Sequence, residues 1–311
     1  SHGGLEEAAG RIGRTEGVVS RATVERFESP YGGSWELASA EPCSPLRPFF
    51  GTYGGYIETS SAITRRLEMP FPRAALILGF GEEISVSPTG EEADLAPGHT
   101  GFLAGLSRGP ALVESNGSQA GVQVNLTPLG AYHIFGVPMS EITNQVVKLD
   151  DLLGPTGREL IERLREAVSW DERFDLLDAL FSRALAANSP PTEAIAWAWR
   201  EIAREPGRVS IRQLANEVGW SHKHLIERFR SEVVLAPKVA GRLVRFDRAV
   251  QAISPGTRPH WSDIAVAAGY YDQAHMSREF REFARCTPME LWRRRLDDGG
   301  IYGGEIEELS R

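Results

Sequence analysis

Two stretches in the last third of the chain decide how that part folds. Residues 211–220 read IRQLANEVGW and residues 261–270 read WSDIAVAAGY. Each has an apolar residue followed by Ala, a Gly four residues after that Ala, and an aromatic residue directly after the Gly. Apolar residues at helical spacing follow both stretches, so the sequence repeats one unit of two helices joined by a glycine turn.

The residue types at the turn are those that a helix-turn-helix unit requires. The small side chains of Ala215 and Ala265 allow two helices to approach closely where they cross. Gly219 and Gly269 stand where the first helix ends, at a left-handed backbone position that disfavours a side chain. A helix, a turn containing glycine and a second helix form the helix-turn-helix plan.

The second helix of each unit is expected to present a polar face to a partner. Ser221 and Asp272 begin these helices as caps, each offering an oxygen to unpaired backbone amides. Apolar residues four apart face inward. The opposite face and the caps supply the residues predicted to contact DNA, namely Ser221, His222, Lys223, His224, Glu227, Arg230, Asp272, Gln273, Ala274, His275, Arg278 and Arg281.

Two such units in one chain predict how the protein meets a duplex. Their recognition helices would enter successive major grooves, ~34 Å apart along one face of the DNA. Gln273 suits adenine, and Arg278 suits guanine or a phosphate. Arg245, in the basic helix that connects the units, has two interpretations: a DNA contact, or a buried ion pair with a carboxylate such as that of Asp263.

The charge distribution supports a DNA-binding end. The chain as a whole carries a net charge of −8, which disfavours binding to phosphate. Residues 190–296, however, contain 18 Lys and Arg against 12 Asp and Glu, a net charge of +6, and the rest of the chain carries −14. The run from Arg293 to Arg295 is read either as a phosphate clamp or as solvated charge.

The repeat resembles the DNA-binding domain of the AraC/XylS family of bacterial transcription regulators. The resemblance covers about a third of the chain, and its diagnostic residues are Ile264-Ala265, Gly269-Tyr270, Asp272-Gln273, His275-Met276-Ser277-Arg278, Phe280-Arg281 and Cys286-Thr287-Pro288. Met276 replaces the usual Phe, and Cys286 the usual Gly. In the more divergent first unit, Glu227 stands where the family often has a basic or amide residue. The resemblance implies an activator or repressor that binds double-stranded DNA.

The front of the chain reads as a β-rich domain over residues 21–152. Short apolar runs are separated by Gly and Pro, and Val122, Val124 and Leu126 alternate as in a strand with one buried face. A sandwich or small barrel is expected, and with the helical end the fold class is α+β. The region from Val122 to Leu185 resembles the sensor half of a bacterial AraC subset, and residues 121–138 carry that resemblance. Residues 1–20 and 297–311 are predicted to be flexible tails.

Residues 153–189 carry two helical runs, each with an apolar stripe. Leu160, Ile161, Leu164 and Val168 form one stripe, and Leu177, Leu180, Phe181 and Leu185 form the other. The stripes either pack on the β-rich domain or form a dimer interface, and both interpretations stay open. Asn188 to Pro191 then predicts a linker to the last domain, residues 190–296.

Several other residues of the β-rich domain are candidates for ligand binding or chemistry. Trp35, Tyr53 and Tyr56 could line a ligand pocket or pack in the core. His99 and His133 are separated and form no His-x-His pair, so no metal site is predicted. Cys43 is read as a loop cysteine rather than a redox or methyl-accepting one, and Cys286 as a structural one. No Gly-x-Ser-x-Gly elbow supports a triad built on Ser107.

The sequence therefore predicts a sequence-specific DNA-binding transcription regulator, with a small-molecule effector of unknown identity at its N-terminal domain. No enzyme activity, cofactor or metal is expected. The two cysteines, the absence of a long apolar span and the missing apolar core of a secretion signal over residues 1–17 favour the cytoplasm and no membrane contact. RNA polymerase and a second copy of the chain are the further candidate partners. The alternatives are a cupin-like β-barrel enzyme with a DNA-binding tether, and a sensor that no longer binds DNA.

Overall fold

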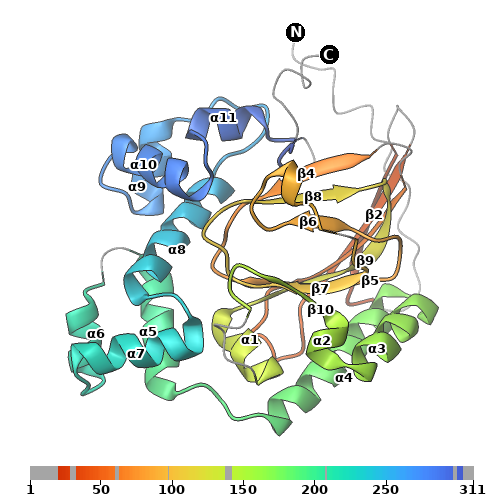
Figure 1. Cartoon of the computed structure of the whole chain (residues 1–311), viewed down its shortest axis with the longest axis horizontal. Helices are drawn as coiled ribbons and strands as arrows, with labels where there is room; N and C mark the ends of the chain where they lie inside the picture. Colours follow the sequence, from red (N-terminus) through yellow and green to blue (C-terminus); the bar gives the residue numbers. More distant parts are fainter. Residues whose placement is uncertain are drawn as a thin grey trace.

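The computed structural model describes residues 20–28, 33–59, 63–96, 98–136, 142–206, 209–296 and 300–303. The predicted tail over residues 1–20 lies outside this part of the chain, apart from Ser20. Figure 1 shows a β-rich domain with its own helices and, beside it, a domain made of helices only. The predicted α+β class, with the strand-rich domain at the N-terminal end and the helical domain at the C-terminal end, is confirmed.

The β-rich domain contains a large and a small antiparallel sheet. The large sheet has the strand order β1-β2-β3-β9-β5-β7-β10, with bounds Thr23–Glu28, Ser34–Ala40, Tyr53–Thr59, Ser118–Leu126, Ala74–Gly79, Gly101–Ala104 and Val146–Lys148. The small sheet has the order β4-β8-β6, with bounds Thr64–Glu68, Ala111–Ser115 and Ser85–Ser87. Since the described strands form two separate sheets, the domain is an open two-sheet structure and not a closed barrel.

The large sheet buries one face against helices and turns the other toward the small sheet. Leu76 pairs with Val124 and Leu78 with Val122, and these side chains are fully buried on the helical side. The alternation predicted for β9 is therefore confirmed. Ile77, one position along from Leu76, lies on the other face and lines a cavity between the sheets.

Helices α1 (Pro128–Phe135), α2 (Leu149–Leu153), α3 (Pro155–Glu166) and α4 (Trp170–Ala187) belong to the β-rich domain. The helical part thus begins a few residues before the predicted boundary at 153. Leu164, Leu177 and Phe181 are buried in the same core as the large sheet, so the stripes pack on the β-rich domain. Val168 does not belong to its predicted stripe, because it follows α3 in a turn and is 93% exposed.

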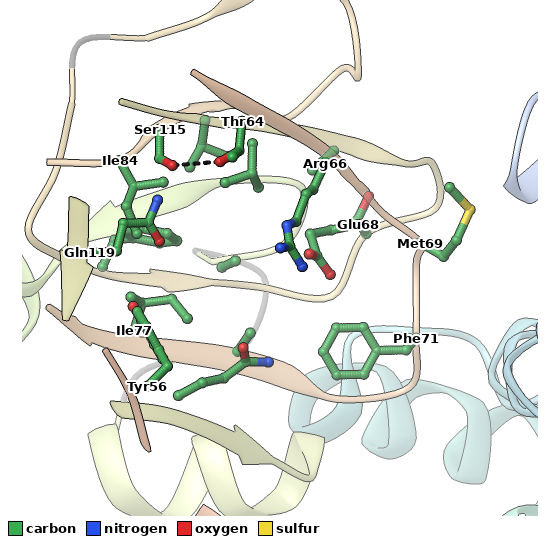
Figure 2. Close-up of a pocket in the computed structure, with 18 of the residues that line it drawn as sticks. Tyr56, Thr64, Arg66, Glu68, Met69, Phe71, Ile77, Ile84, Ser115 and Gln119 are labelled. Carbon is green, nitrogen blue, oxygen red and sulfur yellow. Dashed lines mark hydrogen bonds between the residues drawn. The ribbon is translucent and has the colours of Figure 1, made fainter. Parts of the chain in front are cut away.

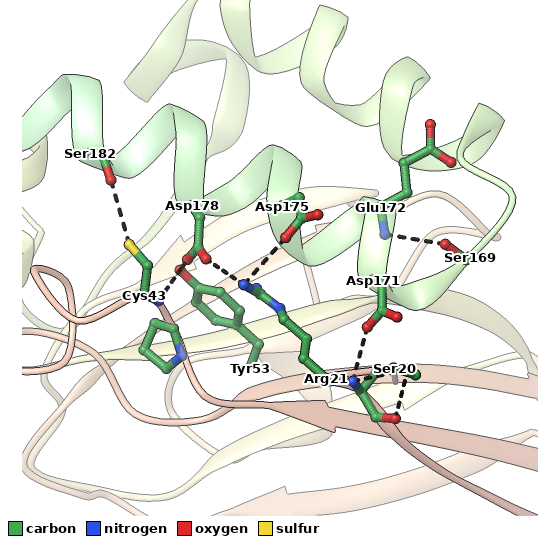
Figure 3. A network of polar contacts seen from close by, with 12 residues as sticks. Ser20, Arg21, Cys43, Tyr53, Ser169, Asp171, Glu172, Asp175, Asp178 and Ser182 are labelled. Atoms are coloured by element: carbon green, nitrogen blue, oxygen red, sulfur yellow. Dashed lines mark hydrogen bonds and ion pairs between the residues drawn. The ribbon is translucent and has the colours of Figure 1, made fainter. Parts of the chain in front are cut away.

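Two close contacts fix α4 on the sheet. The Trp170 ring lies so close to Gly55 in β3 that a Cβ atom there would be 2.2 Å from it. Figure 3 shows the second contact, where the Asp178 carboxylate accepts hydrogen bonds from Arg21 Nη1 at 2.6 Å and the Tyr53 hydroxyl at 2.9 Å. The backbone amide of Cys43 donates to the same carboxylate at 3.2 Å. The helix pair therefore uses its inward face within the chain, and this face offers no basis for the dimer interpretation.

The helical domain follows the linker and comprises α5 to α11. The bounds are Glu193–Arg204, Ile211–Glu217, His222–Val233, Pro237–Gln251, Trp261–Ala268, Gln273–Phe283 and Pro288–Arg293. Helix α8 connects the pair α6 and α7 to the pair α9 and α10 (Figure 1). Among the described helices, none is both long and apolar enough to span a membrane.

Candidate DNA-binding interface and ligand cavity

The two glycine turns have the same geometry. The amide of Trp220 donates to the Ala215 carbonyl at 2.8 Å, and the amide of Tyr270 donates to the Ala265 carbonyl at the same distance. Between them, Gly219 has φ 70° and Gly269 has φ 93°, both in the left-handed region. These are the hydrogen bonds of a helix end closed by a left-handed glycine. The predicted role of both glycines is confirmed, and the repeat seen in the sequence is a repeat of structure.

The second helix of each unit begins at the predicted cap. The Ser221 hydroxyl accepts a hydrogen bond from the His224 amide at 3.1 Å, at the start of α7. The Asp272 carboxylate accepts one from the His275 amide at 2.6 Å, at the start of α10. Each cap satisfies an amide in the first helical turn and so fixes the end of the helix that was predicted to approach DNA.

The faces of α7 and α10 divide as the apolar spacing predicts. Leu225, Phe229, Met276 and Phe280 are fully buried. The opposite face of each helix is exposed, and the residues on it are His222, Lys223, Glu227 and Arg230 in α7, and Gln273, Ala274, Arg278 and Arg281 in α10. Both helices therefore present a polar surface to solvent.

Two histidines near the helix starts differ in orientation from the outward residues. The His275 ring packs edge-on against Tyr270 at 5.2 Å, and its Nε2 lies 3.5 Å from Glu279 Oε1. The His224 ring packs edge-on against Trp220 at 4.6 Å but keeps an exposed side. Of the residues predicted to contact DNA, only His275 is half-buried, and Glu279 lies one turn further along the same face of α10.

A buried ion network holds α10 against α8. The carboxylate of Glu279 accepts hydrogen bonds from Arg242 Nε and Arg245 Nη2, each at 2.9 Å. Arg245 was predicted to pair with a buried carboxylate, with Asp263 as the example; its partner is Glu279, and Asp263 lies exposed on α9. The ion-pair interpretation of Arg245 is therefore confirmed, and the example of Asp263 is wrong.

A cavity of about 330 Å³ lies between the two sheets of the β-rich domain. Its walls are mainly apolar, and they also carry the polar side chains of Tyr56, Glu58, Thr64, Arg66, Glu68, Gln119 and Gln123. Figure 2 shows Arg66 and Glu68 next to each other on the wall, and Thr64 bonded to Ser115. The cavity thus combines apolar area with a few converging polar groups, as ligand sites do.

The three aromatic residues predicted to line a pocket do not lie together. Trp35 and Tyr56 line the cavity, because Trp35 pairs with Glu58 and Leu37 with Tyr56 across β2 and β3, which places all four on one face. Tyr53 is three residues before Tyr56 and therefore faces the opposite side. It is fully buried against Phe174, so the prediction of Tyr53 as a ligand residue is wrong.

The charged groups of the cavity perturb one another. Arg66 Nη2 lies 4.0 Å from Glu58 Oε1. Burial raises the pKa of the Glu68 carboxyl, while Arg66 and Arg295 act in the opposite direction. Burial, followed by the charge of Glu58, raises the pKa of the Tyr56 hydroxyl above its usual value. Tyr56, Glu58 and Arg66 are half-buried, and Glu68 is exposed at the end of β4, so a ligand with both donors and acceptors would meet charged groups of both signs here.

The candidate catalytic and metal-binding residues do not lie close to one another. The Ser107 hydroxyl donates to the Gly109 carbonyl, whereas the His133 ring bonds to the Asn188 carbonyl at 3.2 Å, beside the linker. His99 lies beside Lys148, where burial and that charge lower its pKa. Within the described part of the chain, no group of three or more His, Cys, Asp or Glu side chains has the arrangement of a metal site.

Comparison with known proteins identifies the helical domain. A sequence profile described as a helix-turn-helix domain matches residues 214–295, which include both glycine turns and both polar helices. The C-terminal domain is an AraC-type helix-turn-helix domain. Because domains of this type bind DNA, the chain is a DNA-binding transcription regulator. The enzyme interpretation receives no support from this match.

Two solved structures show a distant likeness. ToxT from Vibrio cholerae aligns over 78% of this chain and 98% of its own, with 13% identity and a TM-score of 0.45. The C-terminal domain of AraT, a response regulator from Geobacillus stearothermophilus, aligns over 34% of this chain and 88% of its own, with 18% identity and a TM-score of 0.31. These similarities are too weak to assign a ligand or a target. No curated protein sequence matches the chain.

The departures of this AraC-type domain from the family pattern fit its core. Met276 replaces an aromatic residue and is fully buried, so a flexible apolar side chain fills that place. Cys286 is half-buried, and burial raises its pKa to about 11, which leaves an unreactive thiol at neutral pH. The structural interpretation of Cys286 is in agreement with these observations.

Tyr271 is a residue of the AraC-type domain that the sequence predictions missed. It stands directly before the Asp272 cap and is 90% exposed, beside the start of α10. Val266 on α9 is also unusually exposed for an apolar residue, at 66%. The signal in the sequence is the pair Tyr270-Tyr271: only one of two adjacent aromatic residues can enter the core at a tight turn. Tyr270 does so, which leaves Tyr271 at the polar surface.

Proposed function

We propose that this chain is a sequence-specific regulator that inserts the N-terminal turns of α7 and α10 into successive major grooves of double-stranded DNA, under the control of a small-molecule effector. The observation that carries the proposal is the pair of matched units, each with a closed glycine turn, a capped helix start and an exposed polar face. One chain could then cover an asymmetric site.

The two units would contribute differently to recognition. On α7, Lys223 Nζ lies 3.7 Å from Glu227 Oε1, so its charge is partly neutralised before DNA arrives. On α10, Arg278 and Arg281 are exposed, and Glu282 is paired with Arg242 rather than with either of them. We assign most base readout to Gln273 and Arg278, with adenine and guanine as their natural targets, and phosphate contacts to Arg281.

The cavity in the β-rich domain is the proposed effector site. Its volume of about 330 Å³ and its mainly apolar wall suit a small molecule with an apolar body. Arg66, Glu68 and Gln119 would pair with polar groups on that molecule. A homodimer and a contact with RNA polymerase are further predictions, and no surface is assigned to either. A cytoplasmic location follows from the need to reach DNA.

A binding experiment tests the DNA half of the proposal. Selection from a random duplex pool would supply a bound sequence, and fluorescence anisotropy would measure its affinity for variants. Arg278→Ala should weaken specific binding by roughly 1–3 kcal/mol, or about 5- to 150-fold. Arg163→Ala, which removes an exposed arginine from α3 in the other domain, is the matched control and should change little. An Arg278→Ala protein with unchanged affinity and unchanged sequence preference would remove Arg278 from the contact set.

A further inference from the structure

A short segment near the C-terminus joins the two domains. Residues 300–303 were predicted to lie in a flexible tail, but they pair with β4 of the small sheet. The Leu67 amide donates to the Ile301 carbonyl at 2.8 Å, and the Gly303 amide donates to the Arg65 carbonyl at 3.0 Å. Since β4 is an edge strand of the small sheet, the segment covers hydrogen-bonding groups that would otherwise be open.

The same segment is bonded to the end of the DNA-binding domain. The Tyr302 amide donates to the Arg294 carbonyl at 2.7 Å, and the Leu296 amide donates to the Gly300 carbonyl at 2.9 Å. Ile301 is 5% exposed, so its apolar side chain is buried at this junction. Residues 300–303 therefore lie between β4 and the residues that follow α11, with backbone bonds to both.

Gly303 packs closely against the small sheet. A Cβ atom there would come within 2.6 Å of Leu112 Cδ1 and 3.2 Å of the Arg65 backbone. A methyl group there would require Leu112 to shift, and a larger branched side chain would also press on the Arg65 backbone. The close approach seats the segment against β8 as well as β4. Residues 300–303 are therefore packed against the small sheet as well as hydrogen-bonded to it.

Strand β4 also forms part of the cavity wall. Thr64, Arg66 and Glu68 alternate along it toward the cavity, while the backbone of the intervening Arg65 and Leu67 bonds the segment 300–303. The Arg295 charge acts on the Glu68 carboxyl across the same junction. A displacement of β4 would therefore change both the cavity wall and the contacts at the end of α11.

A second contact holds the same end of the DNA-binding domain. Arg285, between α10 and α11, has φ 57°, which is an unfavourable backbone conformation for a side chain of its kind. Its Nη1 donates to the Thr89 carbonyl at 2.6 Å, in the loop after β6. The first unit is held elsewhere, where α1 packs against α7 (Figure 1). The β-rich domain therefore contacts both helix-turn-helix units at once.

We propose that residues 300–303 form a latch that fixes the second helix-turn-helix unit to β4, and that occupancy of the cavity changes DNA affinity by moving this latch. The latch itself is independent of any ligand, whereas its control by an effector rests on the proposed function. Both recognition faces are exposed in the latched form, so this form is ready to bind. Releasing the latch removes the backbone bonds between β4 and the end of the second unit, so that α10 moves more freely relative to α7. Freedom that must be lost on binding weakens the complex.

Hydrogen exchange and DNA binding on the full chain test the latch. Ile301→Asp places a charge in the buried junction. Gly303→Val disturbs the same junction in a different way, by placing a branched side chain against Leu112. Both should speed exchange of the Leu67 amide by at least about 10-fold, leave the buried face of α10 protected, and weaken binding to the selected duplex at least about 5-fold. Val168→Asp, a change of the same kind at a 93% exposed position, is the control and should alter neither readout.

The outcomes separate the latch from the proposed function. Fast exchange of the Leu67 amide in the unmodified chain would overturn the latch. Faster exchange in both variants with unchanged DNA affinity would overturn its role in binding. If no variant and no unmodified protein binds any duplex, the proposed function fails, and the exchange data alone decide whether the latch exists.

Discussion

Replacing Glu279 should destabilise the DNA-binding domain far more than replacing its neighbour Glu282. Both carboxylates accept hydrogen bonds from Arg242, but their surroundings differ. The Glu279 side chain is 4% exposed and also binds Arg245, whereas Glu282 is 47% exposed. In Glu279→Ala, Arg242 keeps Glu282 as a partner. Arg245, whose side chain is 9% exposed, loses its carboxylate and becomes a buried charge without compensation.

The magnitude follows from that difference in burial. Removing one partner of a buried ion pair typically costs about 3–5 kcal/mol, because the remaining charge stays desolvated. An exposed pair contributes about 0–1 kcal/mol. We therefore expect Glu279→Ala to lower the free energy of unfolding by about 3–5 kcal/mol and Glu282→Ala by less than about 1 kcal/mol. The combined change Glu279→Leu with Arg245→Met should recover most of the loss, since it removes both charges.

Urea unfolding followed by tryptophan fluorescence is a suitable assay. Five of the seven tryptophans, Trp197, Trp199, Trp220, Trp261 and Trp292, lie within residues 190–296, so the signal mainly reports on the DNA-binding domain. The midpoint of its transition would be compared among the variants at one pH. Equal destabilisation by Glu279→Ala and Glu282→Ala, or a combined variant no better than Glu279→Ala, would refute the reasoning.

Three further predictions concern local chemistry. Gly269→Ala should destabilise the domain by roughly 1–2 kcal/mol, and by more than Gly219→Ala. Both glycines have positive φ, but of the two only Gly269 has a carbonyl oxygen 3.1 Å from the new Cβ, and thermal unfolding of the two variants measures the difference. Burial raises the pKa of the Cys286 thiol from 9.0 to about 11, so this thiol should react with Ellman's reagent roughly 100-fold more slowly than a free thiol. A rate equal to that of free cysteine would contradict the burial. The backbone hydrogen bond from Thr287 lowers the pKa of Glu290, so its stabilisation is present above the unfolded pKa near 4.5 and is lost as the pH falls through the lower folded value. Glu290→Gln should reduce this loss, as acid unfolding curves of the two proteins would show.

The DNA-binding units could be predicted from sequence because local chemistry determines them. A left-handed glycine, a capping oxygen and apolar residues four apart act within a single helical hairpin, and each leaves a direct mark in the sequence. Gly269 and Asp272 had the roles expected of them. The alternation in β9 was equally local, since a strand with one buried face needs only its own pattern.

The features that were missed depend on contacts between distant segments. Glu279 pairs with Arg245, 34 positions away, and no local pattern favours it over Asp263 as the partner. Tyr53 could not be placed without the register of β3, which decides the face of the sheet on which it lies. The pairing of residues 300–303 with β4 joins positions more than 230 residues apart, and only the assembled domains bring them together.

Hydroxyl-radical footprinting of the full chain on a selected duplex tests the central claim most directly. If α7 and α10 enter successive major grooves, two protected windows should appear about 10 base pairs apart on one face of the DNA. Arg278→Ala should then weaken only the window contacted by α10. A single window whose strength does not depend on Arg278, or protection that is independent of sequence, would contradict the account.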